Sequence, residues 1–267
     1  MGIDIRSINA GNFGMNYFKF GSGEKTMVIL PGLSIQSVCL FADSVAKDYS
    51  VFEKDFTVYL FDRRNELPEN YSIQDMADDT ALCFKKSGLS DICLFGASQG
   101  GMIAQIIAAK YPELVNKLAL CSTSVRVDNS QIKTISEWIT QANAGNGSAL
   151  YLSFGKAVYP ENIFEQSKEL LEIAGKAVSQ EEFKRFVLLA QSTEGFDVTG
   201  EISNIRCPVF AAGSDDDIVL GSDSMSELIE KYKENKNFSY HIYENFGHAC
   251  YDTAPDFKER LYSFFNA

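Results

Sequence analysis

The sequence contains few of the residues that hold metal ions or form disulfide bridges. Its 267 residues include only two histidines, and its six cysteines occur singly, with no Cys-x-x-Cys pair. Structural zinc sites draw their ligands from closely spaced cysteines and histidines, so we expect no metal site. Single cysteines in apolar segments are typical of reduced thiols. We therefore expect a cytoplasmic protein without disulfides.

Basic residues and long apolar runs are also scarce. Lys and Arg number 24 against 36 Asp and Glu, which gives a formal net charge of −12. Such a surface repels phosphates, so we expect neither nucleic acid nor an anionic membrane as partner. No apolar run has the length of a membrane span, and the first residues lack the apolar stretch of a signal peptide. The expected partner is a small-molecule substrate, with a homodimer left open.

Short apolar runs and helical patterns alternate along much of the chain, which predicts a mostly parallel sheet of about eight strands. The first two strands, 3–8 and 15–20, form a hairpin. Each of the next strands leads into a helix. The remaining strands are expected at 27–30, 57–61, 92–95, 117–121, 207–212 and 238–243, and the helices at about 37–50, 72–87, 99–110, 223–233 and 255–265.

The alternation stops between residues 122 and 202, where we find no convincing strand. Helical periodicity predicts helices over about 130–143, 163–178 and 180–192, separated by loops such as 145–147. We interpret 122–202 as an inserted helical subdomain, with 1–121 and 203–267 forming the core domain. Its aromatic residues would suit an acyl chain or an aromatic group, or they form the subdomain's own core: Trp138, Tyr151, Phe154, Phe164, Phe183 and Phe186.

The motif Gly96-Ala97-Ser98-Gln99-Gly100 joins an apolar strand to an apolar helix. A serine at such a tight turn exposes its hydroxyl at the carboxyl edge of the sheet, beside the positive end of the helix dipole. The glycines leave room for a turn that side chains would block. Ser98 is therefore the candidate nucleophile.

A serine nucleophile needs a base and an acid that orients the base. Of the two histidines, His241 lies within a strand, whereas His248 follows one in a loop at the expected site edge, so we favour His248. The acid is expected in the cluster of three aspartates at 215–217, which directly follows a strand. Physical reasoning alone does not decide which of the three points inward.

Acyl transfer also requires N–H donors for the oxyanion. The backbone N–H of Gln99 begins the nucleophile helix, and Leu33, after Pro31 and Gly32, is the second candidate. Arg63 and Arg64 follow a strand end and could bind a carboxylate or form ordinary surface salt bridges.

These motifs resemble those of α/β-hydrolase-fold proteins over nearly the whole chain. The matching segments are Leu30-Pro31-Gly32-Leu33, Phe61-Asp62-Arg63-Arg64, Gly96–Gly101, Gly213–Val219 and Gly247-His248. The family's usual acid lies three residues after the glycine, which selects Asp216. The resemblance also implies that 122–202 caps the active site. Pro31 replaces the histidine more common in the family, which leaves only the backbone of this loop as a donor.

Together these residues predict a serine hydrolase that acts on an ester or related acyl bond through Ser98, His248 and Asp216, with no cofactor and no metal. The same triad serves acyltransferases, aminopeptidases and carbon–carbon bond hydrolases. A binding protein that keeps the pocket without the chemistry is the alternative from another class. An intact set of serine, histidine and aspartate argues against it.

Overall fold

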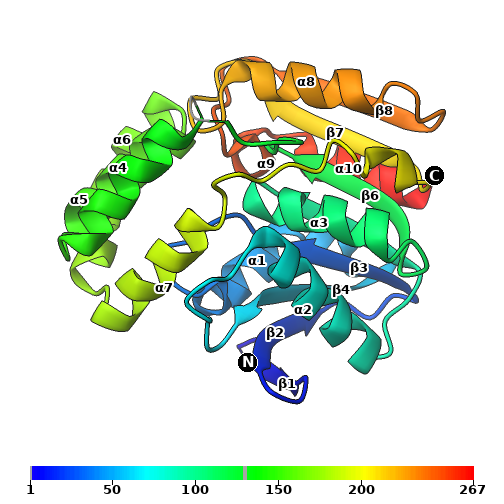
Figure 1. Ribbon diagram of the computed structural model, residues 1–267, viewed down its shortest axis with the longest axis horizontal. Helices are drawn as coiled ribbons and strands as arrows, with labels where there is room; N and C mark the ends of the chain where they lie inside the picture. Colours follow the sequence, from blue (N-terminus) through cyan, green and yellow to red (C-terminus); the bar gives the residue numbers. More distant parts are fainter. Residues whose placement is uncertain (1, 129–130) are drawn as a thin grey trace.

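A computed structural model describes residues 2–128 and 131–267. Figure 1 shows the central sheet with helices packed against both faces. The strand order is β1-β2-β4-β3-β5-β6-β7-β8; β2 pairs antiparallel with β1 and with β4, and the other pairs are parallel. The strands are β1 Arg6–Asn9, β2 Gly14–Phe20, β3 Lys25–Leu30, β4 Phe56–Arg64, β5 Ile92–Ala97, β6 Val115–Cys121, β7 Val209–Ser214 and β8 Phe238–Tyr243. The expected mostly parallel eight-stranded sheet is confirmed.

Alternate residues of the parallel strands pack into two separate cores, one on each face of the sheet. In β3, Val28 and Leu30 join the core beneath helices α2, α3 and α8, whereas Met27 and Ile29 join the core beneath α1, α9 and α10. The bounds of these helices are α1 Ala42–Asp48, α2 Ile73–Lys86, α3 Gln99–Lys110, α8 Ser222–Tyr232, α9 Cys250–Thr253 and α10 Phe257–Asn266. Burial on both faces explains the nearly continuous apolar character of the strands.

The expected start and end of α2 agree with local capping. Ser72 accepts a hydrogen bond from the N–H of Asp75, and the Asp75 carboxylate accepts one from the N–H of Ser72, which completes a capping box at α2. Gly88 follows the helix with a φ of +69°. The segment at 37–50 is less regular than expected, because short 3₁₀ turns, Val38–Phe41 and Ser50–Phe52, flank a two-turn α1.

Between β6 and β7 the chain forms helices that Figure 1 shows gathered at one side of the sheet. They are α4 Ile132–Asn143, α5 Gly147–Val158, α6 Glu161–Lys176 and α7 Gln180–Gln191. Residue 130, where the first of these helices was expected to begin, lies outside the described residues. Helix α5 was not expected from the sequence. Its glycines lower helical propensity, and its stability comes from close packing on α6, where Gly147 meets the backbone of Gly175.

Candidate active site

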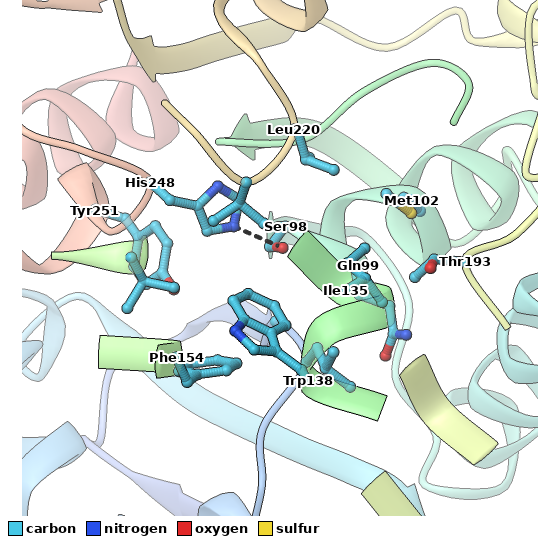
Figure 2. Close-up of a pocket in the computed structure, with 14 residues that line it drawn as sticks. Ser98, Gln99, Met102, Ile135, Trp138, Phe154, Thr193, Leu220, His248 and Tyr251 are labelled. Carbon is cyan, nitrogen blue, oxygen red and sulfur yellow. Dashed lines mark hydrogen bonds between the residues drawn. The ribbon is translucent and has the colours of Figure 1, made fainter. Parts of the chain in front are cut away.

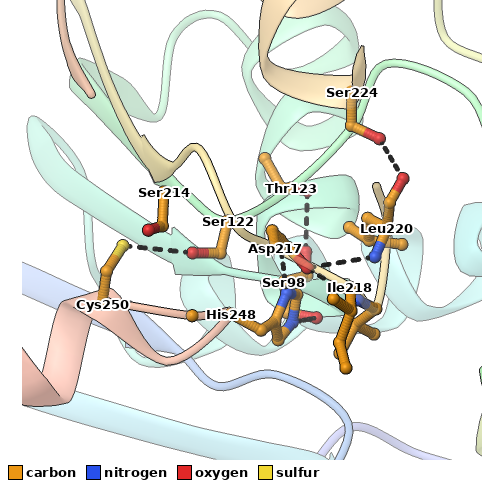
Figure 3. Close-up of polar contacts among 12 residues, drawn as sticks. Ser98, Ser122, Thr123, Ser214, Asp217, Ile218, Leu220, Ser224, His248 and Cys250 are labelled. Carbon is orange, nitrogen blue, oxygen red and sulfur yellow. Dashed lines mark hydrogen bonds and ion pairs between the residues drawn. The ribbon is translucent and has the colours of Figure 1, made fainter. Parts of the chain in front are cut away.

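Ser98 lies at the turn between β5 and α3. Its backbone has a φ of +51°, which is unfavourable for a residue with a side chain. Two hydrogen bonds hold it there: the Ser98 N–H donates to the Cys121 carbonyl at 2.9 Å, and Thr123 Oγ1 donates to the Ser98 carbonyl at 2.8 Å. Figure 3 shows the second bond. The next strand, β6, thus stabilises the strained conformation that presents the hydroxyl.

The glycines of the motif provide the space that the turn requires. A Cβ at Gly96 would lie 2.5 Å from the Gly100 carbonyl oxygen, and one at Gly100 would lie 2.0 Å from the Leu30 carbonyl oxygen. Both contacts are impossible for a real side chain. Any other residue at either position would therefore displace Ser98 or the loop after β3.

The two expected partners Ser98 and His248 meet in the structure. His248 Nε2 lies 2.9 Å from Ser98 Oγ, and the ring is 3% exposed in a loop after β8. Figure 2 shows the imidazole directed at the hydroxyl. The other histidine, His241, lies within β8 with its ring against the edge of Tyr243. The geometry thus agrees with the choice of His248 as the base.

The structure places Asp217, and not the Asp216 that the resemblance selects, against His248. His248 Nδ1 lies 2.7 Å from Asp217 Oδ2, and no hydrogen bond joins His248 to Asp216 among the described residues. Asp217 is 8% exposed, and its second oxygen accepts the N–H groups of Val219 and Leu220. Burial opposes ionisation, but His248 and these N–H groups outweigh it and lower the pKa of Asp217.

The neighbouring aspartates support the loop that carries His248. Asp216 Oδ1 accepts the N–H of Gly247 at 2.8 Å and the hydroxyl of Ser214 at 2.5 Å, while Asp215 Oδ1 accepts the N–H of Asn245 at 3.0 Å. All three carboxylates therefore have partners. The spacing of the aspartates does not show which of them faces the imidazole, because that depends on how the turn after β7 closes.

The two candidate oxyanion donors lie beside Ser98. Leu33 and Gln99 line the pocket at the nucleophile, and neither backbone N–H donates a hydrogen bond to a described residue. The side chain of Gln99 is fixed elsewhere, since its Nε2 donates to the Leu189 carbonyl at 2.7 Å. Gly32 allows the loop to approach, because a Cβ there would lie 3.1 Å from Ser98 Cβ.

Arg63 is a buried part of this arrangement rather than a surface residue. Its NH2 group donates to the Pro31 carbonyl at 2.8 Å and to Gln99 Oε1 at 3.2 Å. One guanidinium thus bridges the two segments that carry the candidate N–H donors. Burial lowers the pKa of Arg63 to about 10 against the opposing charge of Asp62, so the group stays cationic at neutral pH. Arg64 instead pairs with Asp79 at 3.2 Å.

Helices α4 and α5 contribute side chains to the pocket at Ser98. Ile135, Trp138 and Phe154 face it, and the Trp138 indole N–H has no hydrogen-bond partner among the described residues (Figure 2). The pocket is small, about 30 Å³, and it shares lining residues with a larger one. Other aromatic residues of the segment, including Phe183 and Phe186, pack into the core instead. Some aromatic residues of 122–202 therefore line the pocket, and others pack in the core.

All six cysteines are free thiols. Within residues 2–128 and 131–267, no group of His, Cys, Asp or Glu side chains is arranged to hold a metal ion. In the same residues, no helix combines the length and apolar character needed to cross a bilayer.

Comparison with known proteins finds similarity in sequence and in fold. The family model described as "alpha/beta hydrolase fold" matches residues 25–149. The chain is 22% identical over 216 residues to "Putative carbamate hydrolase RutD" of Escherichia coli O81 (strain ED1a), covering 78% of this chain and 80% of that protein. It is 27% identical over 143 residues to "Serine hydrolase BPHL" of Mus musculus, covering 48% of each chain.

Solved structures match over almost the whole length. MGS-M2, an alpha/beta hydrolase enzyme from a Medee basin deep-sea metagenome library, superposes with a TM-score of 0.86 at 21% identity, covering 98% of both chains. The enol-lactonase from Burkholderia xenovorans LB400 superposes with a TM-score of 0.83 at 15% identity, covering 98% of this chain and 100% of that one. The strand order, the serine turn and these matches together show that the chain has the α/β-hydrolase fold.

Proposed function

We propose that the protein is a serine hydrolase that cleaves an ester or related acyl bond of a small molecule. One observation carries the proposal: Asp217, His248 and Ser98 form a continuous hydrogen-bonded chain, and Ser98 Oγ faces a pocket. Hydrolases among the related proteins support the class of reaction. The chemistry requires no cofactor.

In the proposed mechanism, His248 Nε2 takes the proton of Ser98 as Oγ attacks the carbonyl carbon. Asp217 holds the Nδ1–H and stabilises the imidazolium that forms. The N–H groups of Leu33 and Gln99 stabilise the tetrahedral oxyanion, aided by the N-terminal dipole of α3. His248 then protonates the leaving group. It next activates a water molecule that releases the acid and restores Ser98.

The helices between β6 and β7 form the proposed cap over this site. Their residues Trp138 and Phe154 face Ser98 together with apolar residues of the core domain, and the lining is mainly apolar. Such a lining favours an uncharged, apolar environment at the scissile carbonyl. A carboxylic ester fits this environment, and so does a carbamate, which is the substrate class in the name of the RutD relative.

The function is tested with a panel of short- and medium-chain aryl esters and aryl carbamates in water enriched in heavy oxygen. We expect ester turnover with one heavy oxygen atom in the released acid, because water resolves the acyl-enzyme. Transfer of the acyl group to an added alcohol or thiol in preference to water would indicate an acyltransferase. If the protein binds a small molecule but turns over none of the acyl substrates, the non-catalytic binding protein is favoured.

A further inference from the structure

A second pocket of about 470 Å³ adjoins the site at Ser98. The two pockets share lining residues from the loop after β3, from α5 and from the segment after His248: Gly32, Leu33, Phe154, Val158 and Tyr251. A volume of this size accommodates a small organic molecule. A group attached to the carbonyl at Ser98 can therefore extend into it.

The lining of this second pocket is mainly apolar and contains one carboxylate. Side chains of the loop after β3, of α1 and of α5 and α6 supply most of its surface. Asp252, in α9 and next to Tyr251, is the only Asp, Glu, Lys, Arg or His among the described lining residues. The residue is exposed, so its carboxylate is accessible to a ligand.

The Asp252 carboxylate has no direct partner among the described residues, although the charge of Lys258 acts on it. Neither of its oxygens accepts a hydrogen bond or joins an ion pair with a described residue. Lys258 Nζ approaches only the main-chain carbonyl of Asp252, at 3.3 Å, and lies over the ring of Tyr49. Desolvation raises the pKa of Asp252 to about 6; Lys258 lowers it, and Asp48 raises it further. The carboxylate is therefore free to pair with an ammonium group of a ligand, which would form a charge-assisted hydrogen bond with it.

Three tyrosines line the pocket together with Asp252. Tyr49, Tyr159 and Tyr251 all line the pocket, and the charge of Asp252 adds to burial in raising the pKa of each phenol. All three phenols therefore stay neutral at physiological pH. Aromatic rings beside a carboxylate suit a cationic nitrogen, which the ring faces and the negative charge both attract. The net charge of −12 favours the approach of the same kind of ligand.

We propose that the Asp252 pocket binds a cationic amine carried by the substrate, so that the enzyme prefers acyl compounds in which an apolar spacer joins an ammonium group to the scissile carbonyl. This proposal rests on the proposed hydrolase function. The ammonium lies near Asp252 and the tyrosines, and the spacer passes Phe154 and Tyr251 toward Ser98.

The test compares substrates that differ only in charge. Butyrylcholine is paired with dimethylbutyl butyrate, in which carbon replaces the quaternary nitrogen. The ethyl ester of trimethylammoniobutyrate is paired with ethyl dimethylhexanoate, and ethyl aminohexanoate with ethyl heptanoate. The first pair places the cation on the alcohol side and the others place it on the acid side, while the third tests a primary ammonium. We expect the charged member of at least one pair to have a kcat/KM about tenfold higher or more.

The variant Asp252→Asn keeps the shape of the side chain and removes its charge. We expect the ratio of kcat/KM between charged and neutral members to fall about tenfold in this variant. Asp48→Asn is the matched control, because it removes a carboxylate that acts on Asp252 from α1 but does not line the pocket. The control should keep the ratio. Thermal unfolding of each variant shows whether it is folded.

The ratio of kcat/KM between charged and neutral substrates should also depend on pH. Asp252 carries its charge above about pH 6, so the preference for the charged substrate should be complete at neutral pH and disappear as the pH falls through that value. Dividing the two rates cancels any effect of pH that is common to both substrates. Asp48 and Lys258 also act on Asp252, and the raised pKa values of the three tyrosines keep their phenols neutral between pH 5 and 7.

The two proposals fail in different ways. The amine site would be overturned, and the hydrolase kept, by either of two results. One is turnover of neutral esters without any preference for their charged partners. The other is a preference for charged substrates that Asp252→Asn leaves unchanged. If no ester is cleaved, calorimetry with Ser98→Ala and butyrylcholine still tests the pocket directly. If butyrylcholine binds and Asp252→Asn abolishes the binding, the amine site is supported. If neither butyrylcholine nor the ethyl ester of trimethylammoniobutyrate binds, the amine site is overturned.

Discussion

Replacing Ser98 by alanine should lower kcat for ester hydrolysis by about a million-fold. The change removes the only oxygen that lies 2.9 Å from His248 Nε2 among the described side chains, and water alone cannot replace a positioned nucleophile. His248→Ala should cause a loss of similar size, because the two groups act as a unit. Steady-state rates with an aryl ester, checked by product detection at long times, measure both effects.

Ser122→Ala is the matched control for this experiment. Ser122 is also a buried serine with a positive φ, 48°, directly after the neighbouring strand β6, and its hydroxyl contacts Cys250 rather than His248. Its replacement should leave kcat within a few-fold of the wild type. Full activity in a folded Ser98→Ala protein, or equal losses in both variants, would contradict the role of Ser98.

The second large effect on kcat is expected for only one of two adjacent carboxylates, Asp217 and Asp216. Asp217→Asn should lower kcat by about a thousand- to ten-thousand-fold, because the amide cannot stabilise the imidazolium and favours the wrong tautomer of His248. Asp216→Asn should lower kcat by less than about tenfold, since an amide oxygen can still accept the N–H of Gly247. Both variants lose one negative charge, so a general electrostatic effect is the same in each.

Kinetics of the two variants at several pH values measure this difference. Thermal unfolding again serves as the check on folding. If Asp216→Asn showed the larger loss, the acid predicted from the resemblance would be correct and the arrangement at Asp217 would not describe the working enzyme. Equal, small losses would mean that neither carboxylate orients the base.

Much of the fold follows from local patterns in the sequence. The strands are short apolar runs buried on both faces, and Ser72 and Gly88 mark the ends of α2, so alternation and capping predict them. Helix α5 has no comparable signal, because Gly147 and Gly155 weaken its pattern and its packing on α6 supplies the stability. A helix of this kind depends on packing between helices, which local sequence patterns do not show.

The site residues were also predictable only in part from the sequence. Ser98 and His248 are predictable because the motif and the small number of histidines leave few choices. The choice between Asp216 and Asp217 depends on which carboxylate the turn after β7 directs at the imidazole, and the three consecutive aspartates hide that geometry. Sequence reasoning also missed Arg63 as a bridge between the Pro31 loop and Gln99, and Asp252 as a pocket residue. For Asp252, the only signal in the sequence is its position directly after Tyr251, four residues from His248.

Intact-mass spectrometry after incubation with a fluorophosphonate tests the central claim most directly, with wild type beside Ser98→Ala and Ser122→Ala. The account predicts a single adduct on the wild type and on Ser122→Ala, and none on Ser98→Ala, because only a serine activated by its base reacts at the phosphorus. A folded wild type that stays unlabelled, or a Ser98→Ala protein that is labelled as fast as the wild type, would contradict it.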